Sequence, residues 1–462
     1  MNKPLANPAP GATVERLRAT FAAGRTRPAG WRRDQLSALE AMLDAHERDF
    51  SDALKADLGK SATEAYLTEI EFLRGETRHA RRHLGRWMRP RRVSTPLFAQ
   101  PGRSRLVAEP LGVALIMAPW NYPLMLALSP LIGAIAAGNC AVVKPSEIAP
   151  NTSAAIAKHL PDFLDADAFA VIEGDATTAT ALLGERWDKV FYTGNATVGR
   201  IVMAAAAKHL TPVTLELGGK SPCIVLDDAK LDVAARRIVW GKFLNAGQTC
   251  VAPDYVLVDR GQEAALLEAL KRTVADFYGP DPAASEDFAR IVNERHVARL
   301  EPLLDDGEAV TGGQSDAVSR YIAPTVLTNV APDSGVMRDE IFGPILPVLP
   351  VDGLDEAIAF VNARPKPLAL YLFSESRDAA ARVIAETSAG GMAVNDTVLH
   401  LAVPSLPFGG VGESGTGAYH GEFSFRAFSH EKAVLMRRSW PDVMFRYPPM
   451  TRRKLGILKR FL

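Results

Sequence analysis

Between residues 112 and 215, short apolar runs alternate with segments whose apolar residues recur at helical spacing, and this pattern constrains the fold most. Continuous apolar strands separated by helices are typical of βαβ units, in which helices cover both faces of a parallel sheet. Right-handed crossovers then produce a doubly wound, Rossmann-like α/β domain. Strands are expected at 113–117, 141–143, 169–172, 189–192 and 213–215, with helices at about 124–137, 153–164, 178–186 and 198–209.

A second alternation of the same kind runs from residue 223 to about residue 395 and predicts a second α/β domain. This agrees with the length of 462 residues, which exceeds what one hydrophobic core usually serves. The stretch 87–105 is basic and contains prolines, which favours an extended or strand-like excursion. The segment 404–417 is rich in glycine and proline and is expected to be a loop.

The composition is typical of a globular enzyme in a reducing compartment. Lys plus Arg and Asp plus Glu both number 53, so no overall electrostatic field favours nucleic acid as a partner. Only three cysteines occur, which argues against a disulfide framework. The first 21 residues lack the apolar segment of a signal peptide, and no stretch reaches the roughly 18–20 apolar residues that span a bilayer. We therefore expect a cytoplasmic protein without a membrane span.

The last twelve residues, 451–462, mix basic and apolar side chains in the pattern of an amphipathic helix. The ordinary interpretation is a surface helix that packs on its own protein. Weak peripheral contact with an anionic membrane surface is the alternative.

The chemistry begins with a lone thiol, Cys250, in the segment Gly247-Gln248-Thr249-Cys250. A carboxylate that could serve it, Glu216, lies upstream, too far away for the spacing of a metal knuckle or a CxxC redox pair. No metal is therefore expected. A cysteine with a general base is the equipment for covalent catalysis through a thioester. Taken alone, either residue has an ordinary structural explanation, as a small buried hydrophobe or a paired charge.

Six short motifs occur in the order in which a known family has them: Pro119-Trp120-Asn121-Tyr122-Pro123, Lys144-Pro145-Ser146-Glu147, 214–222, 247–255, Glu340-Ile341-Phe342-Gly343-Pro344 and Pro407-Phe408-Gly409-Gly410. Together they resemble the aldehyde dehydrogenase superfamily, over residues 17 to 449. In detail the chain is similar to the class 3 branch, whose members oxidise aromatic and medium- to long-chain aldehydes. Each tetrapeptide alone is a weak signal, whereas six in order are specific.

The resemblance implies that Cys250 attacks the aldehyde and that the Asn121 amide, together with the Cys250 backbone N–H, stabilises the oxyanion. It implies that Glu216 activates the water that hydrolyses the thioester, so that the product is a carboxylic acid. Two alternatives stay open. A CoA-acylating relative would generally lack the glutamate at 216, and a thiol esterase or a non-catalytic scaffold would need no nicotinamide.

The resemblance also implies an NAD site, with NADP as an open alternative. Lys144 and Glu147 match the positions that contact the adenosine ribose, where Glu147 favours NAD and Lys144 could offset a 2′-phosphate. Glu340 matches the residue that holds the nicotinamide ribose, with Phe342 beside it and Trp120 nearby.

The loop from Gly194 to Gly199 precedes a helix, where backbone N–H groups suit a pyrophosphate. The family pattern there begins Gly-Ser-Thr, whereas this chain has Asn195 and Ala196, which leaves the backbone cradle but removes the hydroxyl contacts. By family position the aldehyde pocket consists of Tyr122, Trp240 and Thr249, with His420 at the entrance.

The resemblance finally implies a homodimer, bridged by the basic stretch near Arg103 and the segment 428–438. The expected division of the chain is a cofactor domain at 1–90 and 107–213, a catalytic domain at 214–420, bridging segments at 91–106 and 421–445, and a tail at 446–462.

Overall fold

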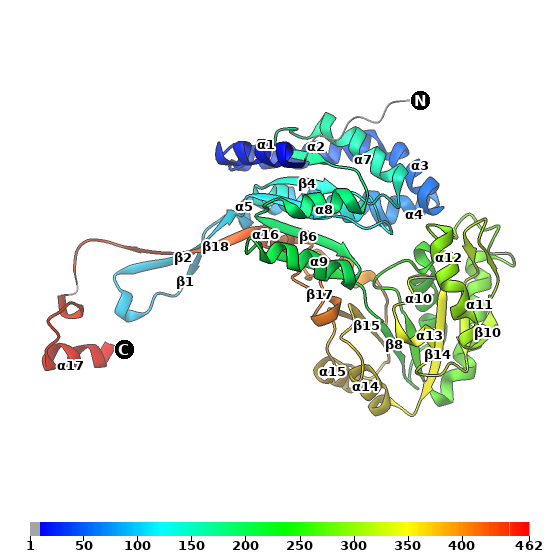
Figure 1. Ribbon diagram of the computed structural model, residues 1–462. Coiled ribbons are helices and arrows are strands. Elements are labelled where there is room, and N and C mark those ends of the chain that lie inside the picture. Colours follow the sequence, from blue (N-terminus) through cyan, green and yellow to red (C-terminus); the bar gives the residue numbers. More distant parts are fainter. Residues whose placement is uncertain (1–9, 443, 462) are drawn as a thin grey trace.

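The structure is a computed structural model that describes residues 10–442 and 444–461, arranged as two α/β lobes and a projecting arm (Figure 1). Two segments with sequence-based expectations lie partly outside the described residues. They are the N-terminal segment expected to lack a signal peptide, of which residues 1–9 are not described, and the expected tail, of which Leu462 is not described.

The first lobe is built on a six-stranded sheet with the order β17-β7-β6-β3-β4-β5. Every residue of β3 and β4 is buried, as expected for strands covered on both faces. The strands from β3 to β7 pair in parallel, which confirms the Rossmann-like prediction, and β17 adds an antiparallel edge. The strands are β3 Val113–Met117, β4 Cys140–Lys144, β5 Phe169–Val171, β6 Lys189–Gly194, β7 Val213–Leu217 and β17 Gly415–Thr416.

Helices cover this sheet, and one of them forms its interior. All residues of α6 are buried, because the helix is apolar all round and packs between α5 and strands β3 and β4. No helix among the described residues is long and apolar enough to cross a membrane. The helices of this lobe are α1 Pro10–Ala22, α2 Ala29–Ala45, α3 Glu47–Leu58, α4 Ala62–Ala65, the π-helical turn Tyr66–Ile70, α5 Glu71–Trp87, α6 Met125–Ala137, α7 Pro150–Phe163, α8 Ala176–Gly184, α9 Ala196–Ala207 and α16 Gly421–Ala427.

The second lobe contains a seven-stranded sheet with the order β10-β13-β14-β9-β8-β15-β16. Its strands pair in parallel except for β10 with β13, so the predicted second α/β unit is confirmed. The strands are β8 Pro222–Val225, β9 Tyr255–Asp259, β10 Glu308–Thr311, β13 Thr325–Thr328, β14 Ile345–Val351, β15 Ala369–Phe373 and β16 Gly391–Val394, with a small hairpin of β11 Ser315–Asp316 and β12 Tyr321–Ile322. The helices are α10 Leu231–Phe243, α11 Glu263–Tyr278, α12 Glu294–Leu300, α13 Gly335–Arg338, α14 Leu354–Asn362 and α15 Arg377–Glu386.

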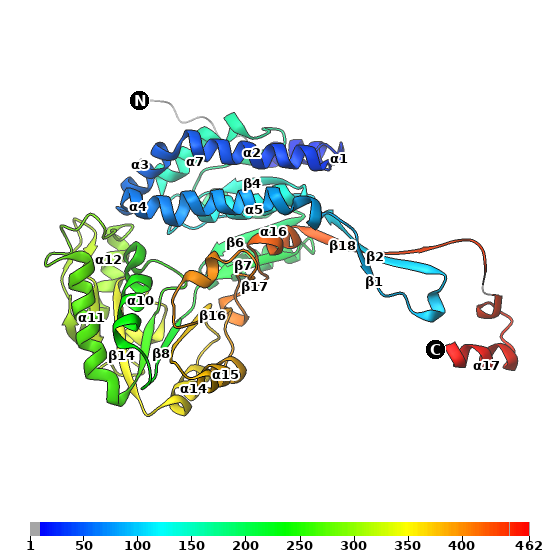
Figure 2. The same cartoon turned by 180° about the vertical axis from the view of Figure 1, so that it is seen from behind.

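The arm is a three-stranded antiparallel sheet, β1-β2-β18, which reaches away from both lobes and carries α17 at its far end (Figure 2). It joins β1 Arg91–Val93 and β2 Gly102–Pro110 to β18 Ser429–Arg437, and α17 spans Arg452–Phe461. The expected excursion after residue 87 is confirmed as strands.

The expected boundaries differ from the structure in three places. Residue 213 begins β7, so a division there separates Leu217 from the sheet to which it belongs. The expected loop 404–417 supplies β17, because Gly415 and Thr416 pair with Glu216 and Leu215. The segment 421–427, expected in the bridge, forms α16 and packs on α5 and α6 of the first lobe.

Candidate active site

A cavity of about 470 Å³ opens at the carboxyl ends of the first lobe's parallel strands. Met117, Lys144, Gly194 and Leu217, the last residues of β3, β4, β6 and β7, all line it. Doubly wound sheets place ligands at this edge because side chains and loops diverge there. The same cavity is lined by Cys250, from the loop before β9, so the two lobes meet around one space.

Glu216 reaches this cavity from the penultimate position of β7. Neither of its carboxyl oxygens has a hydrogen-bond partner among the described residues. Burial raises the pKa of Glu216 well above its ordinary value, although Lys189 opposes the shift. An unpartnered carboxyl with a raised pKa, in a cavity, is available to a bound water molecule, and its ionised form accepts a proton more readily than an ordinary carboxylate does.

The Lys189 ammonium lies on the neighbouring strand β6 and donates to Thr214 Oγ1 at 2.7 Å. Burial lowers the pKa of Lys189 to about 8, and the charge of Glu216 acts against that shift. Lys189 is therefore the cation whose charge stabilises the ionised form of the Glu216 carboxyl.

Cys250 follows a short 3-10 turn, Leu244–Gly247, and is partly exposed to the cavity. Burial raises the pKa of its thiol, and the negative charges of Glu340 and Glu216 raise it further. The thiol form therefore dominates near neutral pH, and the nucleophile forms only when a base accepts the proton. Cys250, Glu216 and Glu340 all line the same cavity.

Asn121 also lines the cavity and is held in place by the loop that carries Cys250. Its Nδ2 donates to the Gln248 carbonyl at 3.0 Å, and its own carbonyl accepts from Asn245 Nδ2 at 2.7 Å. The Gln248 side chain donates to the carbonyls of Asn245 and Arg290 and accepts from Val292 N–H at 2.9 Å, so this loop is held from several sides.

A buried ion pair lies behind Asn121. Lys60 and Glu69 are fully buried, with Nζ to Oε1 at 2.5 Å. Lys60 Nζ also donates to the Asn121 carbonyl at 3.3 Å, and Glu69 Oε2 accepts the N–H groups of Leu124 and Met125 at 2.9 and 3.0 Å. The pair therefore joins the Asn121 segment to the start of α6. Sequence reasoning missed it, because no local pattern marks a lysine that folding will bury.

Glu340 enters the cavity beside the loop that follows β7. Burial and, to a smaller extent, the charge of Asp254 raise the pKa of Glu340 to about 8, against the opposing effect of the Gly219 N–H. A Cβ on Gly218 would lie 1.8 Å from Glu340 Oε2, so only glycine permits this approach. Glu340 Oε1 is buried without a partner among the described residues, so it is available to a hydroxyl group of a ligand.

An aromatic wall stands next to Glu340. Trp120 packs edge-on against Phe342 with ring centroids 5.3 Å apart, and the His296 ring centroid lies 4.8 Å from that of Trp120. Phe342 adopts a φ of 48°, held in place in part by Arg299, which donates to the carbonyls of Ile341 and Phe342. Burial lowers the pKa of His296 to about 4, so the ring is neutral. His296 and Arg299 were missed because neither falls in a motif.

At the other end of the cavity, Lys144 donates to Glu147 Oε2 at 2.7 Å. Asn195 caps α9 by accepting from Val198 N–H, and Gly194 lines the cavity next to it. Gly199 does not line the cavity. A Cβ there would come within 2.9 Å of Leu217, so this glycine serves the packing of α9 on β7.

The four residues expected in the aldehyde pocket are not among those that line the cavity. Tyr122 and Thr249 are buried, with their hydroxyl oxygens 2.6 Å apart. Trp240 is 36% exposed on α10, and His420 is buried with Nδ1 2.9 Å from the Leu401 carbonyl oxygen.

Two aromatic residues that sequence reasoning missed, Phe408 and Tyr419, line the cavity instead. Phe408 belongs to a quoted motif, which was the available signal. Tyr419 pairs with Phe408 through an isolated β-bridge, a contact that only the fold reveals.

Comparison with known proteins agrees with this architecture. The model of the aldehyde dehydrogenase family matches residues 11–434. Aldehyde dehydrogenase family 3 member A2 of Rattus norvegicus is 49% identical over 451 residues, 97% of this chain and 93% of the relative.

Among solved structures, the substrate-bound state of Staphylococcus aureus AldH has a TM-score of 0.95 and 46% identity over 98% of this chain and 99% of that one. An NAD-dependent aldehyde dehydrogenase from Sinorhizobium meliloti has a TM-score of 0.86 and 30% identity over 94% of this chain and 88% of that one.

The chain belongs to the aldehyde dehydrogenase family and is an oxidoreductase that oxidises aldehydes with NAD or NADP. Its similarity to a family 3 member over nearly the whole chain confirms the expected resemblance to the class 3 branch.

Proposed function

We propose that this chain converts an aldehyde into a carboxylic acid through a covalent intermediate on Cys250. The observation that carries the proposal is that Cys250, Glu216 and Asn121 line one cavity, at the strand edge where a dinucleotide binds in doubly wound folds. The thiol supplies a nucleophile, the carboxyl a base, and the amide a donor for the oxyanion.

In the first step, Cys250 Sγ bonds to the carbonyl carbon and its proton passes to a base. The negative charge that develops on oxygen is stabilised by the Cys250 backbone N–H and by Asn121 Nδ2. One Nδ2 hydrogen already bonds the Gln248 carbonyl, and an amide nitrogen carries two, so the second is available. Removal of one such donor typically costs about 3–4 kcal/mol of transition-state stabilisation.

A bound nicotinamide would supply the hydride acceptor, so that oxidation of the adduct held on Cys250 would leave a thioester on the same sulfur. Glu216 then takes a proton from a water molecule, whose oxygen attacks the thioester carbon. The carbon–sulfur bond breaks, and the products are the carboxylic acid and the free thiol of Cys250. Because the pKa of Glu216 is raised, this step accelerates as pH rises and the carboxyl ionises.

The residues at the cavity fit a nicotinamide dinucleotide. The unpartnered Glu340 Oε1 would accept from a ribose hydroxyl, with Phe342 and Trp120 beside it. Lys144 and Glu147 would contact the second ribose. The backbone at Gly194 and Asn195, at the N-terminus of α9, would face the phosphates.

The substrate class we propose is a medium- or long-chain aliphatic or an aromatic aldehyde. Leu368, Phe408 and Tyr419 present apolar surface to the cavity that holds Cys250, and apolar walls favour flat or long apolar substrates. We assign Tyr122 and Thr249 to the support of Cys250. We propose that the aldehyde enters along α10 and α16, where Trp240 and His420 would contact it on its way to Cys250.

Two outcomes separate this proposal from its alternatives. With NAD and an aldehyde, the product should be the free acid, whereas a CoA-acylating enzyme would form acyl-CoA only when CoA is present. Cys250→Ala should abolish the appearance of NADH in an absorbance assay. Full activity in that variant would rule out covalent chemistry on Cys250. Values of kcat/KM for hexanal, dodecanal, benzaldehyde and coniferyl aldehyde then identify the preferred substrate class.

We also propose that the chain is a cytoplasmic homodimer, in which the arm formed by β1, β2 and β18 bridges two copies. Most residues of β18 are exposed, and exposed strands are the surfaces through which sheets pair. The proposed division is a cofactor lobe that includes β7, β17 and α16, a catalytic lobe at 218–414, the arm, and the tail. Light scattering on the full chain should give twice the mass of 49.9 kDa, and a monomer would refute the bridge.

A further inference from the structure

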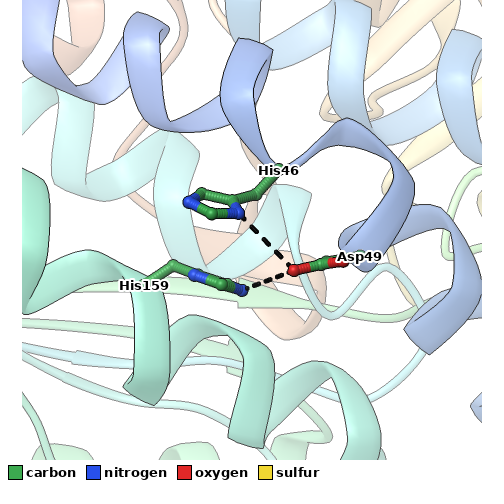
Figure 3. A group of neighbouring side chains, drawn as sticks. All are labelled: His46, Asp49 and His159. Carbon is green, nitrogen blue, oxygen red and sulfur yellow. Dashed lines mark ion pairs between the residues drawn. The ribbon is translucent and has the colours of Figure 1, made fainter.

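Three potential metal ligands meet on the first lobe, and none of them is among the residues that line the catalytic cavity. His46 lies at the junction of α2 and α3, Asp49 lies in the first turn of α3, and His159 projects from α7 (Figure 3). Figure 3 shows both imidazole rings turned toward the Asp49 carboxylate. The catalytic mechanism uses none of these residues.

One of the two separations from the Asp49 oxygen matches the edge of a tetrahedral metal site, and the other is shorter, so the His159 ring must move outward to coordinate. With metal–ligand bonds of about 2.0–2.2 Å, two ligand atoms of tetrahedral zinc are roughly 3.3–3.6 Å apart. Here His46 Nδ1 lies 3.5 Å from Asp49 Oδ2, and His159 Nε2 lies 3.0 Å from the same oxygen. The candidate ligand atoms of the three residues all lie within 4.8 Å of one another.

The surroundings hold these ligands while leaving one side open. His159 is almost fully buried and its ring contacts Phe50 edge-on, and Phe163 contacts the His46 ring in the same way. The Asp49 side chain is 50% exposed, so solvent can supply a further ligand. The two imidazole rings are stacked 3.7 Å apart, and coordination requires them to tilt until their lone pairs converge. The His46 side chain is 28% exposed at a helix junction, which leaves it room to tilt.

We propose that His46, Asp49 and His159 bind a divalent transition metal ion, with Zn²⁺ as the best match to two imidazoles and one carboxylate. The metal would join the α2–α3 corner to α7. Asp57, at the other end of α3, already accepts the N–H groups of Asn151 and Thr152 at the start of α7. A second attachment would therefore fix both ends of the contact between α3 and α7, so the metal has a structural role.

The test uses the full chain after chelation, with ZnCl₂ added and the melting temperature recorded. A ligand that binds only the folded state raises the melting temperature with concentration. We expect such a rise for the wild type, and a loss of at least roughly tenfold in apparent Zn²⁺ affinity for His46→Gln and for the conservative Asp49→Asn. Cobalt(II) should give visible absorption of tetrahedral type with the wild type that Asp49→Asn lacks.

Two controls exclude other zinc ligands. His79→Gln/His83→Gln removes another pair of adjacent imidazoles, on α5, and should leave the shift intact. Chains with Cys250 blocked by alkylation should show the same shift, because the proposed site does not use the catalytic thiol. The proposal is overturned if the wild-type melting temperature does not respond to Zn²⁺, or if His46→Gln and Asp49→Asn respond as the wild type does.

Discussion

The buried pair Lys60–Glu69 offers a quantitative test of how the Asn121 segment is held. Lys60→Met removes the cation and leaves a carboxylate in a fully buried position. Breaking a buried pair in this way costs about 3–5 kcal/mol, because one charge stays desolvated without compensation. Each kcal/mol corresponds to roughly 2–4 °C for a cooperative unit of 150–250 residues, so the melting temperature should fall by about 6–20 °C.

A second substitution separates charge from packing. In Lys60→Met/Glu69→Gln, the new amide oxygen can still accept the N–H groups of Leu124 and Met125, and no bare charge remains. The double variant should therefore recover part of the lost melting temperature, and it should melt well above the temperature that the sum of the two single effects predicts. Lys208→Met, on an exposed lysine, controls for the loss of a surface cation and should leave the melting temperature within about 1 °C.

The assay is differential scanning fluorimetry combined with steady-state kinetics on the same preparations. Because Lys60 donates to the Asn121 carbonyl, Lys60→Met should also lower kcat at a temperature where the variant is folded. Two results would refute this role of the pair: Lys60→Met melting at the wild-type temperature, or a double variant that is less stable than the sum of the two single effects predicts.

Three further predictions concern the cofactor end of the cavity. Gly218→Ala should displace Glu340 and raise the KM for NAD at least roughly tenfold. Gly75→Ala, where a Cβ meets nothing within 4 Å, is the control and should leave the KM unchanged. An unchanged KM in Gly218→Ala would contradict the role of Glu340 in holding the cofactor. Glu147→Gln should improve kcat/KM for NADP relative to NAD by roughly fivefold, since about 1 kcal/mol of like-charge repulsion beside Lys144 is removed; an unchanged ratio would place the 2′ position elsewhere. The pKa of Glu340 rises from 4.5 to about 8 on folding, so wild-type stability should fall as pH rises through that window. The melting temperature of Glu340→Gln should therefore increase relative to that of the wild type from pH 5 to 8. A difference in melting temperature that does not change with pH would count against the raised pKa.

The sheets could be predicted from the sequence because their signal is local. Each buried strand is a short apolar run, and the expected strand 113–117 is the strand observed. Helix ends differ by about two residues, as at α8, because Asp175 caps its start through a side-chain hydrogen bond that apolar spacing does not report.

Contacts between distant parts of the chain could not be predicted in this way. The sequence around Lys60 does not indicate that its ammonium will be buried against Asn121. The sequence around His46 likewise does not indicate that its ring will lie against His159. The strand β17 was expected to be a loop, because its pairing with β7 is a tertiary contact within a glycine-rich segment. Trp240 was expected in the pocket by position in a family, but α10 presents it at the surface.

The most direct test of the covalent mechanism is to trap the intermediate. Glu216→Gln removes the proposed base while it keeps the shape of the side chain, so hydrolysis should become the slow step. After incubation with NAD and benzaldehyde, mass spectrometry should find the acyl group on the peptide that contains Cys250, and Cys250→Ala should carry none. Wild-type turnover by Glu216→Gln without this adduct, or an adduct on another residue, would contradict the mechanism.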